Sequence, residues 1–254
     1  MKNTHIQFNK QEAFTMAEVL ITLAIIGIVA ALTIPQVLAK HKKAVVETEL
    51  KKAFSVLNQA IARSEVDNES AAYWEWAAVS GREGKERFFD KYLRPYLSIR
   101  GNYSSSLSQG KARFIPISGA GESLAWYYNN INNPRFVILS DGSVVRFQTA
   151  NGRGGQVGSW QVILPHSASK KRIMFGRDAF SFSINLNKNK ASVSVFPNSY
   201  LGWNCQIVEQ YRADFISKCY ELGSNTSGIY PDSYCTILIY CNNWKIPDDY
   251  PIHF

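Results

Sequence analysis

The sequence lacks the residue patterns by which catalytic sites are usually recognised. Its histidines, His5, His41, His166 and His253, are scattered singly, and no serine lies in a GxSxG nucleophile elbow. The glycine-rich stretch Asn151–Gly158 has neither GxGxxG spacing nor a terminal GKS or GKT, and it follows a predicted hairpin. We therefore expect a flexible loop there, and neither enzyme activity nor a cofactor.

Cysteine is absent from the first four fifths of the chain. Cys205, Cys219, Cys235 and Cys241 form an even set without a CxxC spacing or a nearby histidine, which is not the pattern of a zinc site. Disulfides in an oxidising compartment are therefore favoured over free buried thiols. Four cysteines can pair in three ways, and we favour neighbours in the sequence, Cys205 with Cys219 and Cys235 with Cys241.

Charge is almost absent from the 21 residues Phe14–Ile34. At about 1.5 Å per residue, a helix of this length spans roughly the 30 Å of a bilayer core. Glu18 is the one charged residue within it, and a lone carboxylate in lipid costs about 3 kcal/mol without a partner. We expect a membrane-spanning helix over 14–35 in which Glu18 has a function.

The residues before this run determine what kind of membrane segment it is. Met1–Ala13 is short and polar, and the small residue Ala13 precedes the apolar run, whereas a secretory signal has its small residues after it. The layout resembles the type III signal of type IV pilins and type II secretion pseudopilins. The resemblance implies a leader over 1–13, cleavage by a prepilin peptidase between Ala13 and Phe14, and N-methylation of Phe14. Ala13 stands where the family usually has glycine.

The same resemblance gives Glu18 and Pro35 roles in assembly. Glu18 is the fifth residue of the processed chain, and its carboxylate can pair with the terminal amine of a neighbouring subunit. Pro35 stands where many members have proline, and a proline kinks or locally melts a helix. The alternatives are a simple signal anchor with a tolerated polar residue, and a Pro35 that only marks the membrane exit.

An amphipathic helix is predicted to follow over 36–66. Apolar residues recur at steps of three and four, which forms one stripe: Val46, Leu50, Ala53, Phe54, Leu57, Ala60 and Ile61. Lysines occupy much of the remaining surface. We expect the stripe to pack on a globular domain over 70–254, because it is too short for a free coiled coil.

The globular region is predicted to have the α+β class, with short helices and an antiparallel sheet, and the whole chain to be pilin-like. Aromatic residues between Trp74 and Tyr96 indicate short helices, followed by a loop over Ser104–Gly110. Strands are predicted over Arg113–Ile117, Trp160–Leu164 and Phe180–Phe196, the last with a turn at Asn187–Lys190. Arg135–Gln148 is a hairpin signal with an Asp-Gly turn.

The globular region also resembles pilin-like proteins, more faintly, in its Asp141-Gly142 hairpin, its Gly-x-Asp-x-Phe element Gly176–Phe180 and its cysteine-bearing tail. Major pseudopilins of this type carry a calcium loop, which needs several oxygen ligands. Asp178 is near Lys170, Lys171 and Arg172, and the adjacent Asp248 and Asp249 are more typical of a solvated tail. We expect no metal.

Charge is the remaining indicator of partners and orientation. The net charge of +8 becomes +7 when the leader takes away Lys2, Lys10 and Glu12. Lys170–Arg172, Lys188 and Lys190 are the candidate nucleic-acid patch, against which we favour a solvated basic surface. The positive-inside rule alone would leave the large domain in the cytoplasm, but the cysteines favour a location outside it.

The sequence thus predicts a structural subunit, with its size favouring a minor one, of a type IV pilus or a type II secretion pseudopilus. Its partners would be the prepilin peptidase, other pilin or pseudopilin subunits and the inner-membrane assembly platform. It would cross the bacterial inner membrane once, with the C-terminal domain outside the cytoplasm, and then enter the filament. The alternatives are a tip adhesin or DNA-binding minor pilin, and a membrane-anchored domain that never polymerises.

Overall fold

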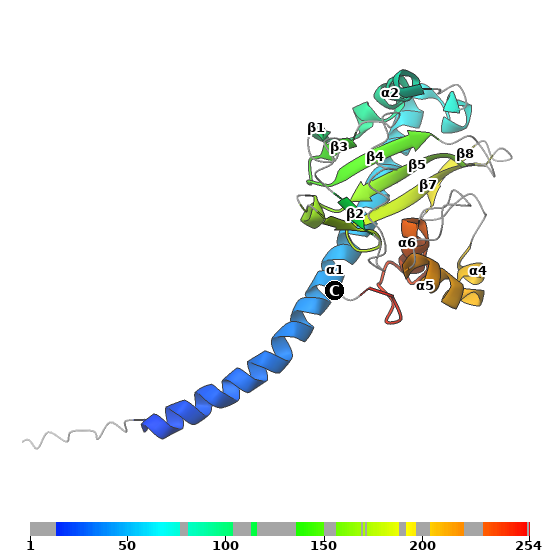
Figure 1. The fold of residues 1–254 in the computed structure, drawn as a ribbon. Coiled ribbons are helices and arrows are strands. Elements are labelled where there is room, and N and C mark those ends of the chain that lie inside the picture. Colours follow the sequence, from blue (N-terminus) through cyan, green and yellow to red (C-terminus); the bar gives the residue numbers. More distant parts are fainter. Residues whose placement is uncertain are drawn as a thin grey trace, which may run out of the picture. The chain divides into compact units, whose positions relative to one another are not determined.

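The structure is a computed structural model, and it divides into two compact units, Met1–Lys42 and Lys43–Phe254, which are described separately (Figure 1). It describes residues 14–76, 81–103, 113–115, 136–149, 156–168, 170, 172–187, 192–196, 204–220, 231–252 and 254. The leader, Lys171, Lys188, Lys190, the loop 104–110 and the turn 188–190 therefore lie outside the described residues, as does most of Asn151–Gly158.

Helix α1 spans Met16–Asn68 and continues through Pro35 without a break. In the first unit its apolar side chains are exposed, as a membrane segment requires. In the second unit one side of the helix is buried: Val46, Leu50, Ala53, Leu57, Ala60, Ile61 and Ser64. These are the residues of the predicted stripe, with Phe54 only partly buried and Ser64 added. The 3.6-residue period thus identified the side of α1 that packs on the domain.

Short helices rich in aromatic residues follow α1, as the sequence predicts. They are η1 (Ala71–Tyr73), α2 (Gly81–Tyr92) and η3 (Arg94–Tyr96), which contains Pro95. The rings of Trp74 and Tyr92 stack at 4.6 Å between centroids, and Phe88 lies 4.8 Å from Trp76. This cluster closes the domain beyond the end of α1.

A six-stranded sheet in the order β1-β3-β4-β5-β7-β8 forms the centre of the domain, and all its neighbouring strands are antiparallel. The strands are β1 (Ile99–Tyr103), β3 (Phe136–Leu139), β4 (Val144–Thr149), β5 (Gln156–Ile163), β7 (Ala179–Asn187) and β8 (Ser192–Phe196). A separate parallel pair joins β2 (Arg113–Ile115) to β6 (Arg172–Met174). The predicted α+β class is confirmed.

The predicted hairpin is β3–β4, and its turn shows why Asp141-Gly142 suits it. Gly142 has φ +89°, a conformation that glycine adopts without strain. Oδ1 of Asp141 accepts hydrogen bonds from the amide (2.9 Å) and the hydroxyl (2.7 Å) of Ser143. Gly142 thus supplies the backbone conformation that the turn needs, and Asp141 supplies the hydrogen bonds that hold it.

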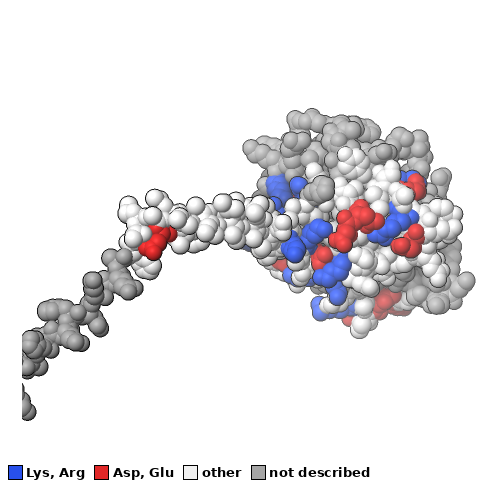
Figure 2. All heavy atoms as spheres, turned by 90° about the horizontal axis from the view of Figure 1, so that it is seen from below, with Lys and Arg blue, Asp and Glu red and all other residues white. Residues whose placement is uncertain are grey.

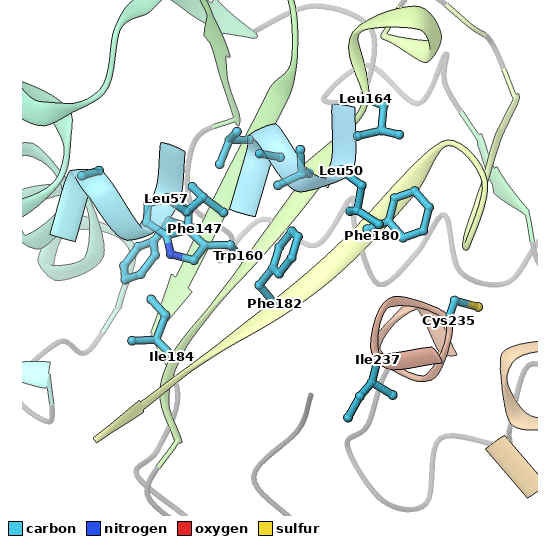
Figure 3. Close-up of a cluster of buried hydrophobic side chains, with 14 of the residues drawn as sticks. Leu50, Leu57, Phe147, Trp160, Leu164, Phe180, Phe182, Ile184, Cys235 and Ile237 are labelled. Carbon is cyan, nitrogen blue, oxygen red and sulfur yellow. The ribbon is translucent and has the colours of Figure 1, made fainter. Parts of the chain in front are cut away.

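One face of the sheet packs on α1 and forms the core (Figure 3). Leu50 and Leu57 of α1 lie near ring side chains that alternate along three adjacent strands: Phe147, Trp160, Phe180 and Phe182. Each of these side chains is at most 1% exposed. Successive side chains of a strand point to opposite faces, so the residues between them lie on the other face.

Three helices in the cysteine-bearing region follow the sheet, and the sequence analysis did not anticipate them. They are α4 (Cys205–Gln210), α5 (Arg212–Tyr220) and α6 (Pro231–Cys241). Helix α6 packs near β7 and buries Ile237, Leu238 and Ile239. A 3-10 turn, η5 (Pro165–Ser167), lies between β5 and β6.

Candidate functional site: the membrane segment and the Asp178 cluster

The start of α1 brings Thr15 and Glu18 together. Oε2 of Glu18 accepts hydrogen bonds from the amide and the hydroxyl of Thr15, both at 2.8 Å, and the Glu18 amide donates to the Thr15 hydroxyl at 3.2 Å. This is the reciprocal pairing of a capping box, which satisfies backbone donors at a helix start. The carboxylate is therefore held beside the first turn, four residues from the Phe14 amine that cleavage would create.

The residues after Glu18 form the one described helix that is long and apolar enough to cross a membrane. Its large side chains are exposed, from Ile21 at 60% to Ile34 at 54%. Figure 2 shows this part of the helix without Lys or Arg, and with acidic atoms only near its start. Phe14 is 86% exposed, and Ala13 lies outside the described residues. Pro35 is within the helix and exposed.

In the described part of the globular unit, several charged side chains surround Asp178, a residue of the Gly-x-Asp-x-Phe element. Its side chain is fully buried and accepts hydrogen bonds from the Ser167 hydroxyl (2.7 Å), Lys170 Nζ (2.8 Å) and the Met174 amide (2.9 Å). The guanidinium of Arg177 lies 3.0 Å from Oδ2. The protein's own cations thus occupy the position that a bound cation would need.

His166 extends this cluster to α1. Its Nδ1 lies 2.5 Å from Oε2 of Glu49, and its Nε2 lies 3.8 Å from Oδ1 of Asp178. Asp178 and then Glu49 raise the pKa of His166, against the opposing effects of burial and Lys170. Burial alone would raise the pKa of Asp178, but His166, Arg177, Lys170 and the Met174 amide together hold it far below its ordinary value.

This cluster contains no arrangement that indicates catalysis. The Ser167 hydroxyl donates to Asp178 and is fully buried. Within the described part of the chain, no three His, Cys, Asp or Glu side chains lie close enough together to hold a metal ion. Asp249, one of the calcium candidates in the tail, pairs with Arg212 at 2.6 Å, and Asp248 is exposed. The cluster connects α1 to η5 and to the turn before β7.

The four cysteines form two nested disulfides, Cys205–Cys241 and Cys219–Cys235, with Cα atoms 5.3 Å and 4.9 Å apart. The expected pairing of sequence neighbours is therefore wrong. Cys235 and Cys241 lie on the same helix, α6, where six residues separate their Cα atoms by about 9 Å, beyond the roughly 7 Å that a disulfide can bridge. The chain reverses between α5 and α6, so each half of this hairpin supplies one cysteine to each bond.

The candidate nucleic-acid patch is not assembled by the described residues. Lys170 is engaged by Asp178, and Arg172 lies in β6, while Lys171, Lys188 and Lys190 lie outside the described residues. On the face of the globular unit that Figure 2 shows, Lys and Arg side chains alternate with acidic ones. A mixed surface of this kind is typical of solvated charge.

Comparisons with known proteins match the chain twice. A family model described as "Family of unknown function (DUF6613)" matches residues 36–254, and a model of the "Prokaryotic N-terminal methylation motif" matches residues 8–34. The second match contains Ala13, Phe14 and Glu18 and ends directly before Pro35. No curated protein and no solved structure matches the chain.

Proposed function

Because the chain belongs to the family of unknown function DUF6613 and is a type IV pilin-like protein, we propose that it is a minor subunit of a type IV pilus or a type II secretion pseudopilus. The observation that carries this proposal is the methylation motif over residues 8–34, joined to a helix that is long and apolar enough to cross a membrane. The motif belongs to prepilin-processed, structural proteins. The chain is accordingly a membrane-anchored protein with a single span.

Processing is the first step of the proposed pathway. A prepilin peptidase cuts between Ala13 and Phe14, and the new amine of Phe14 is methylated. The carboxylate of Glu18 already lies beside the first turn of α1, which supports a role in receiving an amine. In the filament that amine belongs to a neighbouring subunit, so docking removes an unpaired charge from lipid. Pro35 follows the motif and allows the helix to bend during packing.

One observation supports a location of the large unit outside the cytoplasm, and a second supports a minor position in the filament. The paired cysteines Cys205–Cys241 and Cys219–Cys235 suit an oxidising compartment. The domain is also large for a subunit that repeats along a filament shaft, which supports a minor position. Assembly then proceeds from the inner membrane through the assembly platform.

The experiment that tests this function starts with the mature protein. Intact-mass measurement and amino-terminal sequencing are expected to give a chain that begins with N-methyl-Phe14. A mature chain that keeps Met1, or that is cut after Ala31, would contradict the proposal.

A substitution at Glu18 tests the assembly step. Glu18→Val removes the carboxylate and makes membrane insertion easier, because a charge leaves the lipid. Cleavage before Phe14 is expected to persist, while the protein disappears from sheared filaments and accumulates in the inner membrane. Thr22→Val is the matched control, since Thr22 lies in the same run and its hydroxyl bonds only to the Val19 carbonyl at 2.9 Å. Normal incorporation of the Glu18→Val chain would leave the segment as a simple anchor.

A further inference from the structure

A groove follows the solvent-facing side of α1 within the globular unit. It consists of two adjoining hollows of about 530 and 240 Å³, which share Lys52, Val56 and Gln59. The floor continues along one side of the helix from Thr48 to Arg63, opposite the buried stripe. The two hollows therefore adjoin along one side of α1, and together they are called the groove.

Ion pairs with α1 hold both walls of this groove in place. On one side, Glu47 accepts hydrogen bonds from Lys245 Nζ (2.7 Å) and from the Ile246 amide (2.9 Å). On the other side, Lys52 pairs with Asp141 of the β3–β4 turn at 3.0 Å. The two contacts fix the loop after α6 and the hairpin turn to the same helix. Both pairs have a largely exposed lysine, so each contributes about 1 kcal/mol or less to holding the walls.

The charge of the groove is positive. Four cations line it, Lys51, Lys52, Arg63 and Lys245, against two carboxylates, Glu47 and Asp141. Both carboxylates are engaged by cations of the groove. Lys51 and Arg63 are exposed, and the described residues include no ion-pair partner for either. They lie twelve positions apart on α1, which is about 18 Å of helix rise and about a third of a turn around the axis, so they stand at the two edges of the floor.

This spacing indicates the chemistry of the occupant. A nucleic-acid strand carries a phosphate about every 3.4 Å and needs a dense row of cations. The groove instead has two cations without an ion-pair partner among the described residues, and between them lie Lys52, which is paired with Asp141, and the uncharged Ser55, Val56 and Gln59. Two isolated carboxylates of a protein segment fit this arrangement, with polar and small apolar side chains between them.

A second copy of the chain is disfavoured as that occupant. The processed chain has a net charge of +7, since the leader takes Lys2, Lys10 and Glu12 from the +8 of the full sequence, so two copies repel each other. A different and acidic chain avoids this repulsion.

We propose that the groove binds an acidic segment of a different pilin-type subunit, which presents one carboxylate to Lys51 and another to Arg63. The inference rests on the proposed function, since it places that subunit beside this one in the filament. A subunit with a unique acidic neighbour occupies a defined place in an assembly, as a minor subunit does.

The test is crosslinking in the living cell with the full chain. A photoreactive p-benzoylphenylalanine replaces Gln59, an exposed residue of the groove floor, and the adduct is identified by mass spectrometry. The expected adduct is with one acidic pilin-type subunit. The double variant Lys51→Glu, Arg63→Glu is expected to lower its yield about tenfold, because like charges then face each other. Reversal of the two partner carboxylates to lysine is expected to restore it.

Arg100→Glu is the matched control, because Arg100 is exposed in β1 and outside the groove. The neutral pair Lys51→Gln, Arg63→Gln, which leaves the buried side of α1 unchanged, is expected to give an intermediate yield. An adduct with a second copy, with a nucleic acid or with no molecule overturns the inference, as does a yield that charge reversal leaves unchanged. In parallel, the wild-type chain is followed in sheared filaments. Its absence from the filaments counts against the proposed function. Its presence there without an adduct counts only against binding of an acidic subunit in the groove.

Discussion

The carboxylate of Glu49 on α1 lies 2.5 Å from Nδ1 of His166, and this contact links the helix to the buried charge of Asp178 beyond it. A neutral imidazole donates from only one of its nitrogens, whereas His166 has a carboxylate on each side. The arrangement therefore favours the imidazolium. Part of the stability of the globular unit is therefore expected to depend on the protonation of His166.

The first prediction concerns pH. The pKa of His166 is raised in the folded chain, so its contribution to stability is fully present below the unfolded value near 6.5 and is lost as pH rises through the folded value. The low pKa of Asp178 keeps its own contribution constant throughout this range. Thermal unfolding of the full chain in detergent, from pH 5 to pH 9, is expected to show a falling melting temperature above that point.

The variant His166→Gln separates this effect from other titrations. It is expected to lose on the order of 1 kcal/mol at pH 5 and to remove that part of the pH dependence. His41→Gln alters an exposed histidine on α1 and is expected to keep the wild-type profile. If the melting temperatures of wild type and His166→Gln change with pH in the same way, the contacts of His166 with Glu49 and Asp178 contribute no pH-dependent stability.

The sequence predicted those parts of the fold that local patterns encode. The buried side of α1 follows from its three- and four-residue spacing, and the β3–β4 hairpin follows from the Asp141-Gly142 turn. Helix α6 was missed because its apolar run, Cys235–Tyr240, is too short for periodicity to separate a buried helix from a strand. The disulfide pairing was missed for the same reason, since it depends on two cysteines sharing that helix.

The link between the Asp178 cluster and α1 could not be predicted because Glu49 is remote in the sequence from the other members, which lie between His166 and Asp178. Glu49 and His166 are 117 positions apart, and neither has a recognisable motif. One signal was available. Glu49 directly precedes Leu50 of the buried stripe, and a carboxylate at the edge of such a stripe needs a cationic or hydrogen-bonding partner. Nothing in the sequence identified His166 as that partner.

The second prediction concerns the buried carboxylate itself. Asp178→Asn keeps the shape of the side chain but removes the charge that Lys170 and Arg177 share. We expect a loss of about 3 kcal/mol in the free energy of unfolding, measured by urea denaturation at pH 7. Asp248→Asn, at an exposed position in the tail, is expected to change it by less than about 0.5 kcal/mol. Equal effects of the two substitutions would contradict a structural role for Asp178.

The third prediction concerns calcium. Because Lys170, Arg177 and Ser167 already satisfy the oxygens of Asp178, an added cation would have to displace them. Calcium is added at about 5 mM, a concentration on the order of those that fill extracellular calcium sites, and is removed with a chelator in a parallel sample. Neither treatment is expected to move the melting temperature by more than about 1 °C. A rise with Ca²⁺ that Asp178→Asn abolishes would show that the cluster binds the ion after all.

The fourth prediction concerns Gly176, where the turn before β7 meets the C-terminal segment. Gly176 has φ +75°, and a Cβ added there would lie 2.6 Å from Sγ of Cys235 and 3.0 Å from the Tyr250 hydroxyl. That hydroxyl donates to the Gly176 carbonyl at 2.6 Å. Gly176→Ala is expected to cost about 3 kcal/mol in urea denaturation, because backbone strain and overpacking add.

Gly101→Ala is the matched control for that substitution. A Cβ at Gly101 meets no atom within 4 Å, and its φ is not positive. The expected cost is below about 1 kcal/mol. If the two alanine variants unfold at the same urea concentration, the close approach of Gly176 to Cys235 does not affect the free energy of unfolding.

The last prediction concerns the disulfides. Non-reducing peptide mapping of protein purified without reductant is expected to recover Cys205 with Cys241 and Cys219 with Cys235. The two bonds close loops of 36 and 16 positions, so the unfolded chain is constrained more by the first. Replacing Cys205 and Cys241 by serine is expected to lower the free energy of unfolding by about 4 kcal/mol, and replacing Cys219 and Cys235 by about 3 kcal/mol before cavity effects.

Cys219 and Cys235 are buried among the core residues, so their serine variants also place hydroxyls in apolar surroundings. Alanine variants separate that contribution from the loss of the bond. Recovery of Cys235 linked to Cys241 would require α6 to unwind and would contradict the fold of this region.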